Sequence, residues 1–224
     1  MKIGVAVPCY KYHIQKLKRC LDSIESQEVK PDLVMVSCSS SESTDIPEEY
    51  KKIYSFPLQI LTFTGRQNAS ENRNIASREL ISQGCTHISY FDCDDVMHPQ
   101  RIKSIKFAFQ CLPECDIVLH AYHDHNEVHQ NFIDYKTVDI VVNYLRRAPT
   151  GCAWLEFQTD ARIHHSQSSI RSEIFERVQY REGKEYERKE DSIFCGDVLS
   201  LPNSKNVYVR NYLSKYYLEG QWFE

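Results

Sequence analysis

The first 120 residues alternate short apolar runs with longer amphipathic stretches, and this alternation constrains the fold more than any other feature of the sequence. Residues 3–7 and 33–36 are continuous apolar runs, which are typical of strands covered on both faces. Between them, residues 13–28 carry a helical stripe of apolar side chains with polar residues in between. Strand–helix alternation of this kind predicts an α/β fold with a largely parallel sheet and helices on both faces.

The same signals predict the remaining elements. We expect strands over residues 58–63, 88–91, 116–122 and 207–209, and helices over about 70–84, 100–112, 136–147, 173–178 and 191–201. Ser70 is a plausible N-cap of the helix that follows the third strand, and Gly84 is a plausible residue just beyond its end. No linker, repeat or low-complexity tract interrupts the chain, so we expect one domain over residues 1–224.

Three carboxylates follow the fourth predicted strand. Asp92, Asp94 and Asp95 stand within four positions, before Pro99 opens the next helix. Acids this close raise each other's pKa values unless a cation shares them. Mg²⁺ and Mn²⁺ use one or two carboxylates together with phosphate oxygens, and open α/β sheets bind ligands beyond the carboxyl ends of their strands. The motif therefore predicts a metal and diphosphate site; a solvated acidic loop is the alternative.

Composition excludes several other classes of protein. The net charge of −4 shows no basic face for nucleic acid, and no apolar run reaches the length of a membrane span or a signal-peptide core. Nine cysteines without repeated spacing are typical of reduced thiols, so we expect a cytoplasmic protein. The seven glycines form neither a dinucleotide-binding nor a phosphate-loop motif. Structural zinc is disfavoured because the His and Cys residues between 111 and 129 lack paired ligand spacing.

Six segments, in order along the chain, resemble the inverting family-2 type of nucleotide-sugar glycosyltransferase, which has the GT-A fold. They are 5–10, which ends in Pro-x-Tyr, 34–45, 68–74, which ends in Arg73-Asn74, 91–99, 168–175, and Glu190-Asp191. The resemblance implies a single GT-A (nucleotide-diphospho-sugar transferase) domain, with a nucleotide-binding half over about 1–99 and an acceptor-binding half over about 100–224. One departure stands out: Ser37-Cys38 occupy the place where the family carries an Asp near the uracil.

The resemblance also implies an activity and a set of site residues. We expect hexosyl or deoxyhexosyl transfer, with inversion, from a UDP or dTDP sugar to a hydroxyl of a glycan or glycoconjugate. Asp191 would be the general base and Glu190 would orient a substrate hydroxyl. The nucleotide sugar would be bound by Pro8, Tyr10, Ser37, Ser39, Asn68, Arg73, Asp92, Cys93 and Asp94. Mn²⁺ or Mg²⁺ would be held by Asp92, Asp94, Asp95 and His165.

Each of these roles has a plainer alternative. Tyr10 could stack on the nucleobase or be a core aromatic residue. Asp95 would bind either the metal or a neighbouring backbone amide. Asp191 could be an ordinary acid at a helix N-terminus, where the helix dipole favours it. Arg73 is electrostatically unfavourable at a helix start, which indicates an anionic or base partner.

Two other functions remain open. A sugar-1-phosphate nucleotidyltransferase shares the layered sheet and the carboxylate–metal chemistry, but it needs a glycine-rich loop after the first strand, and residues 10–12 lack glycine. A non-catalytic nucleotide-sugar-binding module is the third reading, and Asp191 argues against it.

Overall fold

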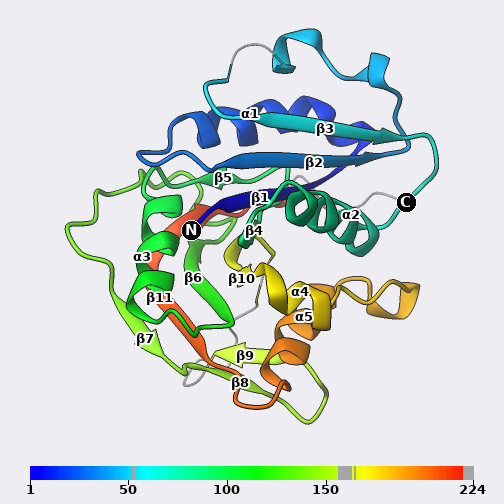
Figure 1. Cartoon of the computed structure of the whole chain (residues 1–224). Helices are drawn as coiled ribbons and strands as arrows, with labels where there is room; N and C mark the ends of the chain where they lie inside the picture. The colour runs from blue at the N-terminus through cyan, green and yellow to red at the C-terminus, as the bar shows by residue number, and fades with distance from the viewer. Residues whose placement is uncertain (52–53, 156–162, 164, 219–224) are drawn as a thin grey trace.

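The strands of the computed structural model, which describes residues 1–51, 54–155, 163 and 165–218, form one large mixed sheet. Its strands are β1 (Ile3–Tyr10), β2 (Leu33–Ser39), β3 (Leu58–Phe63), β4 (His87–Tyr90), β5 (Val96–Met97), β6 (Ile117–His123), β7 (Ile140–Val142), β10 (Ser169–Arg171) and β11 (Asn206–Lys215). Their order is β3-β2-β1-β4-β10-β6-β11-β5, and β7 also pairs with β11 (Figure 1).

The central strands run mostly parallel. β1 pairs in parallel with β2 and β4, β2 with β3, and β6 with β11. β10 is antiparallel to both β4 and β6, so it joins two parallel groups that point the same way. The carboxyl ends of β1, β2, β4, β6 and β11 therefore share one edge of the sheet, where ligands of α/β proteins bind. The predicted mostly parallel α/β fold is confirmed.

Helices cover both faces of the sheet (Figure 1). They are α1 (Ile14–Glu25), α2 (Ala69–Ser82), α3 (Arg101–Cys111), α4 (Ser172–Arg177) and α5 (Glu190–Leu199). Alternate residues of β1 enter different cores, as the pleat requires. Val5 and Val7 pack with Leu17 of α1, whereas Ala6 packs with Leu80 of α2. The cluster that contains α2 also contains apolar residues of α4 and α5.

Two expectations for local structure are wrong. Residues 136–147 are not helical: they contain β7 and β8 (Leu145–Arg147), and β8 pairs with β9 (Ala153–Leu155). The apolar residues there are largely β-branched, which fits strands, and β7 pairs with β11. The N-cap of α2 is Asn68, whose side chain accepts from Glu71 N at 2.9 Å while Glu71 accepts from Asn68 N. Gly84 does follow the end of α2 in the left-handed region, with φ +79°.

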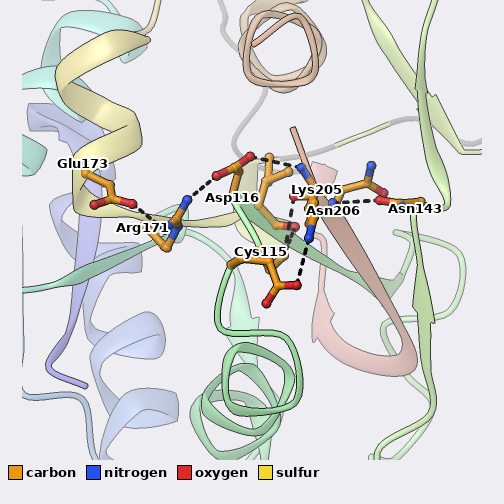
Figure 2. A network of polar contacts seen from close by, with 9 residues as sticks. Cys115, Asp116, Asn143, Arg171, Glu173, Lys205 and Asn206 are labelled. Atoms are coloured by element: carbon orange, nitrogen blue, oxygen red, sulfur yellow. Dashed lines mark hydrogen bonds and ion pairs between the residues drawn. The ribbon is translucent and has the colours of Figure 1, made fainter. Parts of the chain in front are cut away.

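Charged and polar side chains fasten the opposite edge of the sheet, at the amino ends of β6 and β11. Figure 2 shows Arg171 between Asp116 and Glu173, where it forms ion pairs with both. Asp116 also accepts the backbone N–H of Lys205 at 3.0 Å. These contacts join β10 and α4 to β6 and β11, so the strands that frame the carboxyl edge are held at their other ends.

Helix α5 packs directly on the backbone of the β8–β9 connection. A Cβ atom at Gly196 would overlap the carbonyl group of Gly151, so only glycine permits this approach. The contact sets the position of α5, whose first turn carries Glu190 and Asp191.

Candidate functional site

The acidic motif forms a turn directly after β4, and its third carboxylate points inward. Asp95 is fully buried. Its Oδ2 accepts from Ser166 Oγ at 2.5 Å, and its Oδ1 accepts from the backbone N–H of Tyr217 at 3.1 Å. Burial, and then the charges of Asp94 and Asp92, raise the pKa of Asp95 well above its usual value. Of the two roles expected for Asp95, the structure displays the contact with a backbone amide.

Ser166 ties the motif to a distant segment of the chain. It lies in the 3₁₀ helix η4 (His165–Gln167), and its hydroxyl oxygen accepts the backbone N–H of Asp92 at 3.1 Å while donating to Asp95. Its carbonyl oxygen accepts from Nη2 of the fully buried Arg101 at 3.0 Å. The Ser166 hydroxyl therefore holds the acidic turn, and Arg101 holds the backbone of Ser166.

Asp94 of the acidic motif has a shifted pKa. Burial, followed by the charge of Asp92, raises the pKa of Asp94 to about 6. Lys16 and Arg19 of α1 oppose this shift, and Arg19 donates to the carbonyl oxygen of Asp94. A divalent cation at Asp94 would relieve the repulsion that remains.

Arg73 connects the acidic motif to the first turn of α5. Its side chain is 4% exposed; Nη2 lies 2.7 Å from Asp92 Oδ1 and Nη1 lies 3.9 Å from Glu190 Oε1. Asp92 and Glu190 are the anionic groups that face this arginine, and its expected contact with the nucleotide sugar stays a prediction. Asp92 and Glu190, which stand 98 positions apart in the sequence, are thus joined through one guanidinium group.

The neighbouring Asn74 holds the segment that leads to α5. Its Nδ2 donates to the carbonyl oxygen of Tyr180 at 2.9 Å, and its Oδ1 accepts from Tyr180 N at 3.0 Å. The ring of Tyr180 stacks on Phe194 of α5, with centroids 4.0 Å apart, and lies under the Arg73 guanidinium at 5.6 Å. The Arg-Asn pair of α2 therefore positions both the acidic motif and the start of α5.

Asp191 lies beside Glu190 in the first turn of α5, half-buried. Its Oδ1 accepts the backbone N–H of Ser192 at 2.6 Å. The helix N-terminus favours the ionised carboxylate. The position suits a proton acceptor, and the assignment of Asp191 as the base stays a prediction.

The residues expected to bind the base differ in how deeply they are buried. Tyr10 is half-buried at the end of β1, where its ring meets Tyr12 edge-on at 5.3 Å. Ser37 and Ser39 are fully buried. Ser37 Oγ donates to Asn72 Oδ1 at 2.8 Å, and Asn72 Nδ2 donates to Ser39 Oγ at 3.2 Å. Sequence reasoning gave Asn72 no role, but it is the polar group that contacts both serines.

Three other predicted residues lie at buried or helix-capping positions. Asn68 caps α2, and Pro8 pairs with Ser37 on the buried part of β1. Cys93 is buried, with 3% of the residue exposed. His165 belongs to η4, but its side chain lies outside the part of the chain that the structure describes, as does His164 altogether.

A match to a family model covers residues 4–196, under the description "Glycosyl transferase family 2". The chain belongs to glycosyl transferase family 2. No curated protein sequence matches it. The expected membership of a family-2 glycosyltransferase family with the GT-A fold is therefore confirmed.

Solved structures of TarS from S. aureus share the fold of this family-2 chain. TarS 1–349 in complex with UDP-GlcNAc superposes with a TM-score of 0.69 at 15% identity, over 100% of this chain and 60% of that one. TarS 1–349 in complex with UDP gives 0.64 at 15% identity, over 97% and 61%. A further TarS structure gives 0.65 at 16% identity, over 97% and 37%. The chain thus spans about 60% of the first of these relatives.

Asp92 and Asp94 fit a divalent cation whose remaining ligands would be phosphate oxygens and water. Among the described residues, no group of three His, Cys, Asp or Glu side chains is arranged to hold a metal. Mg²⁺ and Mn²⁺ need only one or two carboxylates when phosphate oxygens and water complete the shell. Asp94, with its raised pKa, and the partly exposed Asp92 match that donor set.

One histidine of the disfavoured zinc reading, His120, has other partners. His120 is fully buried; its Nε2 accepts from Arg101 Nε at 2.9 Å and its Nδ1 lies 2.8 Å from the carbonyl oxygen of Ala121.

In the described part of the chain, no helix is long and apolar enough to cross a bilayer.

Proposed function

We propose that this family-2 chain transfers a sugar, with inversion, from a nucleoside diphosphate sugar to a hydroxyl group of a glycan or glycoconjugate. One observation carries the proposal: the Arg73 guanidinium contacts both Asp92 of the acidic motif and Glu190 beside the candidate base. A transferase needs its donor site and its base close together, and Arg73 supplies that connection.

The diphosphate of the donor would lie at Asp94 and Asp92 together with a divalent cation, Mn²⁺ or Mg²⁺. A bound cation neutralises charge that develops on the departing diphosphate. Tyr10 would stack on the base at the end of β1. Asp191 would accept the proton of the acceptor hydroxyl as its oxygen attacks the anomeric carbon from the face opposite the leaving group. Glu190, held by Arg73, would orient a substrate hydroxyl.

A uracil or thymine base is the preferred donor base. A pyrimidine fits the stacking surface of Tyr10, and TarS, which has the same fold, was solved with UDP-GlcNAc and with UDP. Ser37-Cys38, expected at the place of the family's acidic residue, lie within β2, where the buried Ser37 hydroxyl donates to Asn72. A neutral acceptor contributes about 1 kcal/mol less than a charged one, so discrimination among bases should be modest.

The role of Asp191 is tested by Asp191→Asn, which keeps the size of the side chain but cannot accept the proton. Release of UDP from a panel of UDP sugars, with Mn²⁺ and candidate glycan acceptors, should fall by about 10²–10⁴-fold while UDP binding persists. Asp197→Asn is the matched control, because Asp197 lies in the same helix and pairs with Arg181 instead. Unchanged turnover would remove Asp191 as the base, and loss of UDP binding would place it at the diphosphate.

The choice of base is tested separately. UDP, dTDP, GDP and CDP compete for the protein in the presence of Mn²⁺, and displacement of one labelled nucleotide is followed. UDP or dTDP should displace it best. Preference for GDP by about tenfold, a difference of about 1.4 kcal/mol, would contradict this base pocket.

A further inference from the structure

Arg101 is a fully buried arginine at the first position of α3, shortly after the acidic turn. Each of the five N–H groups of its guanidinium has an acceptor, and these acceptors lie on three strands and in η4. They are Nε2 of His120 and Oγ of Ser89 at 2.9 Å, Sδ of Met97 at 3.9 Å, and the carbonyl oxygens of Tyr90 and Ser166 at 3.0 Å.

None of these acceptors is a carboxylate, and Arg101 forms no ion pair with any residue that the structure describes. Taking a charge out of water is costly, and neutral hydrogen-bond partners offset only part of that cost. Stability of the core is therefore a weak reason for a cation at this position. What the guanidinium supplies is a set of donors in a fixed plane, which holds its acceptors in one relative arrangement.

The guanidinium joins the two ends of the acidic turn. Tyr90 precedes the turn and Arg101 follows it, so the hydrogen bond from Arg101 to the carbonyl oxygen of Tyr90 closes residues 91–100 into a loop. The ring of Phe91, the first residue of this loop, lies 4.9 Å from the guanidinium. A loop whose ends are joined has less conformational freedom than an open segment of the same length.

The contact with Ser166 extends this constraint to the carboxylates. The carbonyl oxygen of Ser166 accepts from Arg101, and the hydroxyl group of the same residue contacts the backbone N–H of Asp92 at 3.1 Å and Oδ2 of Asp95 at 2.5 Å. Asp94 stands between these two acids in the sequence, so the backbone is held on both sides of it. Arg101 therefore acts on the three acids through one serine.

His120 has the tautomer that this arrangement needs. Its Nδ1 lies 2.8 Å from the carbonyl oxygen of Ala121, which can only accept, so Nδ1 carries the proton. Nε2 then has a lone pair for the N–H of Arg101. The imidazole is neutral in this state, which avoids a second cation beside the guanidinium.

We propose that Arg101 is a positioning residue of the donor site, whose guanidinium holds the acidic turn in the conformation in which Asp92 and Asp94 face the diphosphate and its cation. Arg101 touches neither of these itself, because its side chain is fully buried. It acts through Ser166 and through the backbone of Tyr90. The effect on donor binding rests on the proposed function, whereas the order of the turn does not.

The order of the turn is tested by hydrogen–deuterium exchange in the metal-free full chain, for the parent and for Arg101→Lys. Lysine keeps the charge but has a single nitrogen, so it cannot reach all five acceptors. The peptide that covers residues 91–98 should exchange about tenfold faster in Arg101→Lys. Arg171→Gln is the control, since Arg171 is an ion-paired arginine at the opposite edge of the sheet, and it should leave this peptide unchanged.

The consequence for the donor is measured by titrating UDP into the same proteins in MnCl₂ and in EDTA. In Arg101→Lys, UDP affinity in Mn²⁺ should fall by about tenfold or more, so that the gain on adding Mn²⁺ is largely lost. Arg171→Gln should keep the full gain. An arginine that only stabilised the fold would lower the melting temperature and leave the gain from Mn²⁺ unchanged.

Ser89→Ala removes one acceptor of Arg101 and gives a milder variant in case Arg101→Lys does not fold. It should show the same change in exchange at a smaller size. Unchanged exchange of residues 91–98 in the folded variants would overturn the proposal, and so would a full gain from Mn²⁺ in Arg101→Lys. If the parent bound no UDP while exchange was still faster in Arg101→Lys, the proposed function would fail and the role of Arg101 in ordering the turn would stand.

Discussion

Nη2 of Arg73 lies 2.7 Å from Oδ1 of Asp92, in a position where the arginine side chain is almost completely buried. A buried cation near the positive end of α2 is unfavourable on its own, and the carboxylate offsets that cost. The same guanidinium faces Glu190 at 3.9 Å. Arg73 therefore holds one carboxylate from each half of the proposed site in a fixed relation.

Arg73→Gln should disrupt both halves of the site. The variant removes the charge and the forked geometry, so Asp92 and Glu190 each lose their ion pair with Arg73. We expect UDP affinity to fall by about tenfold or more, with a stability loss of about 1–3 kcal/mol. Arg73→Lys keeps the charge but lacks the forked guanidinium. Its UDP affinity and stability should lie between those of the parent and those of Arg73→Gln. Titration of UDP and urea unfolding measure these effects.

The control for this series is Arg78→Gln, since Arg78 lies in the same helix and donates to Gln179 near the surface. It should behave like the parent protein in both assays. Normal UDP binding by Arg73→Gln would show that the connection between Asp92 and Glu190 is not needed for the donor.

Asp94 should make the metal-free protein less stable as the pH rises. Its pKa is raised from 3.8 in the unfolded chain to about 6 in the folded protein, because of burial and the charge of Asp92. The folded state holds this proton more tightly, so the stabilisation is complete below the unfolded pKa and is lost as the pH rises through the folded pKa. Asp94→Asn cannot ionise and escapes this loss.

In EDTA, the melting temperature of Asp94→Asn relative to the parent should therefore increase between about pH 4 and about pH 7. Asp124→Asn, at an exposed carboxylate after β6, is the control for an Asp→Asn substitution outside the acidic motif. If the difference in melting temperature between Asp94→Asn and the parent stayed constant across this pH range, Asp94 would ionise as freely in the folded protein as in the unfolded chain.

Ser166→Ala should destabilise the acidic turn. The hydroxyl group satisfies both the backbone N–H of Asp92 and Oδ2 of the buried Asp95, and alanine leaves these groups without it. The expected cost is about 1–3 kcal/mol in the free energy of unfolding, measured by urea denaturation. Ser200→Ala, which removes an exposed hydroxyl bonded to Asp197 O, should cost less than about 0.5 kcal/mol. Equal effects of the two substitutions would contradict a specific role for Ser166.

The alternation of elements in the first half of the chain was predictable because each element has a strong local pattern. β1 and β2 are uninterrupted apolar runs, and α1 has a clear apolar stripe. The apolar residues of 136–147 also fit a helical spacing. Only the pairing of β7 with β11 decides between helix and strand there. A local sequence pattern does not indicate a strand partner that lies more than 60 residues away in the chain.

The same limit applies to the site. The acidic motif and the Arg-Asn pair stand close to strand and helix ends, so their chemistry was readable from the sequence. The inward direction of the Asp95 side chain could not be predicted from the sequence, because it depends on Ser166 and on the backbone of Tyr217. Asn72 was equally hidden, because its contacts with Ser37 and Ser39 require β2 and α2 to be placed side by side.

Calorimetric titration of UDP into the protein in MnCl₂ and in EDTA, for the parent and for Asp94→Asn, tests whether the acidic turn binds the donor with a metal ion. If the acidic turn holds a cation–diphosphate group, the parent should bind UDP in Mn²⁺ and lose at least about tenfold in affinity in EDTA. Asp94→Asn should bind weakly in both buffers, and the control Asp124→Asn should match the parent. UDP affinity that depends on neither Mn²⁺ nor Asp94 would contradict the central claim that this turn is the donor site.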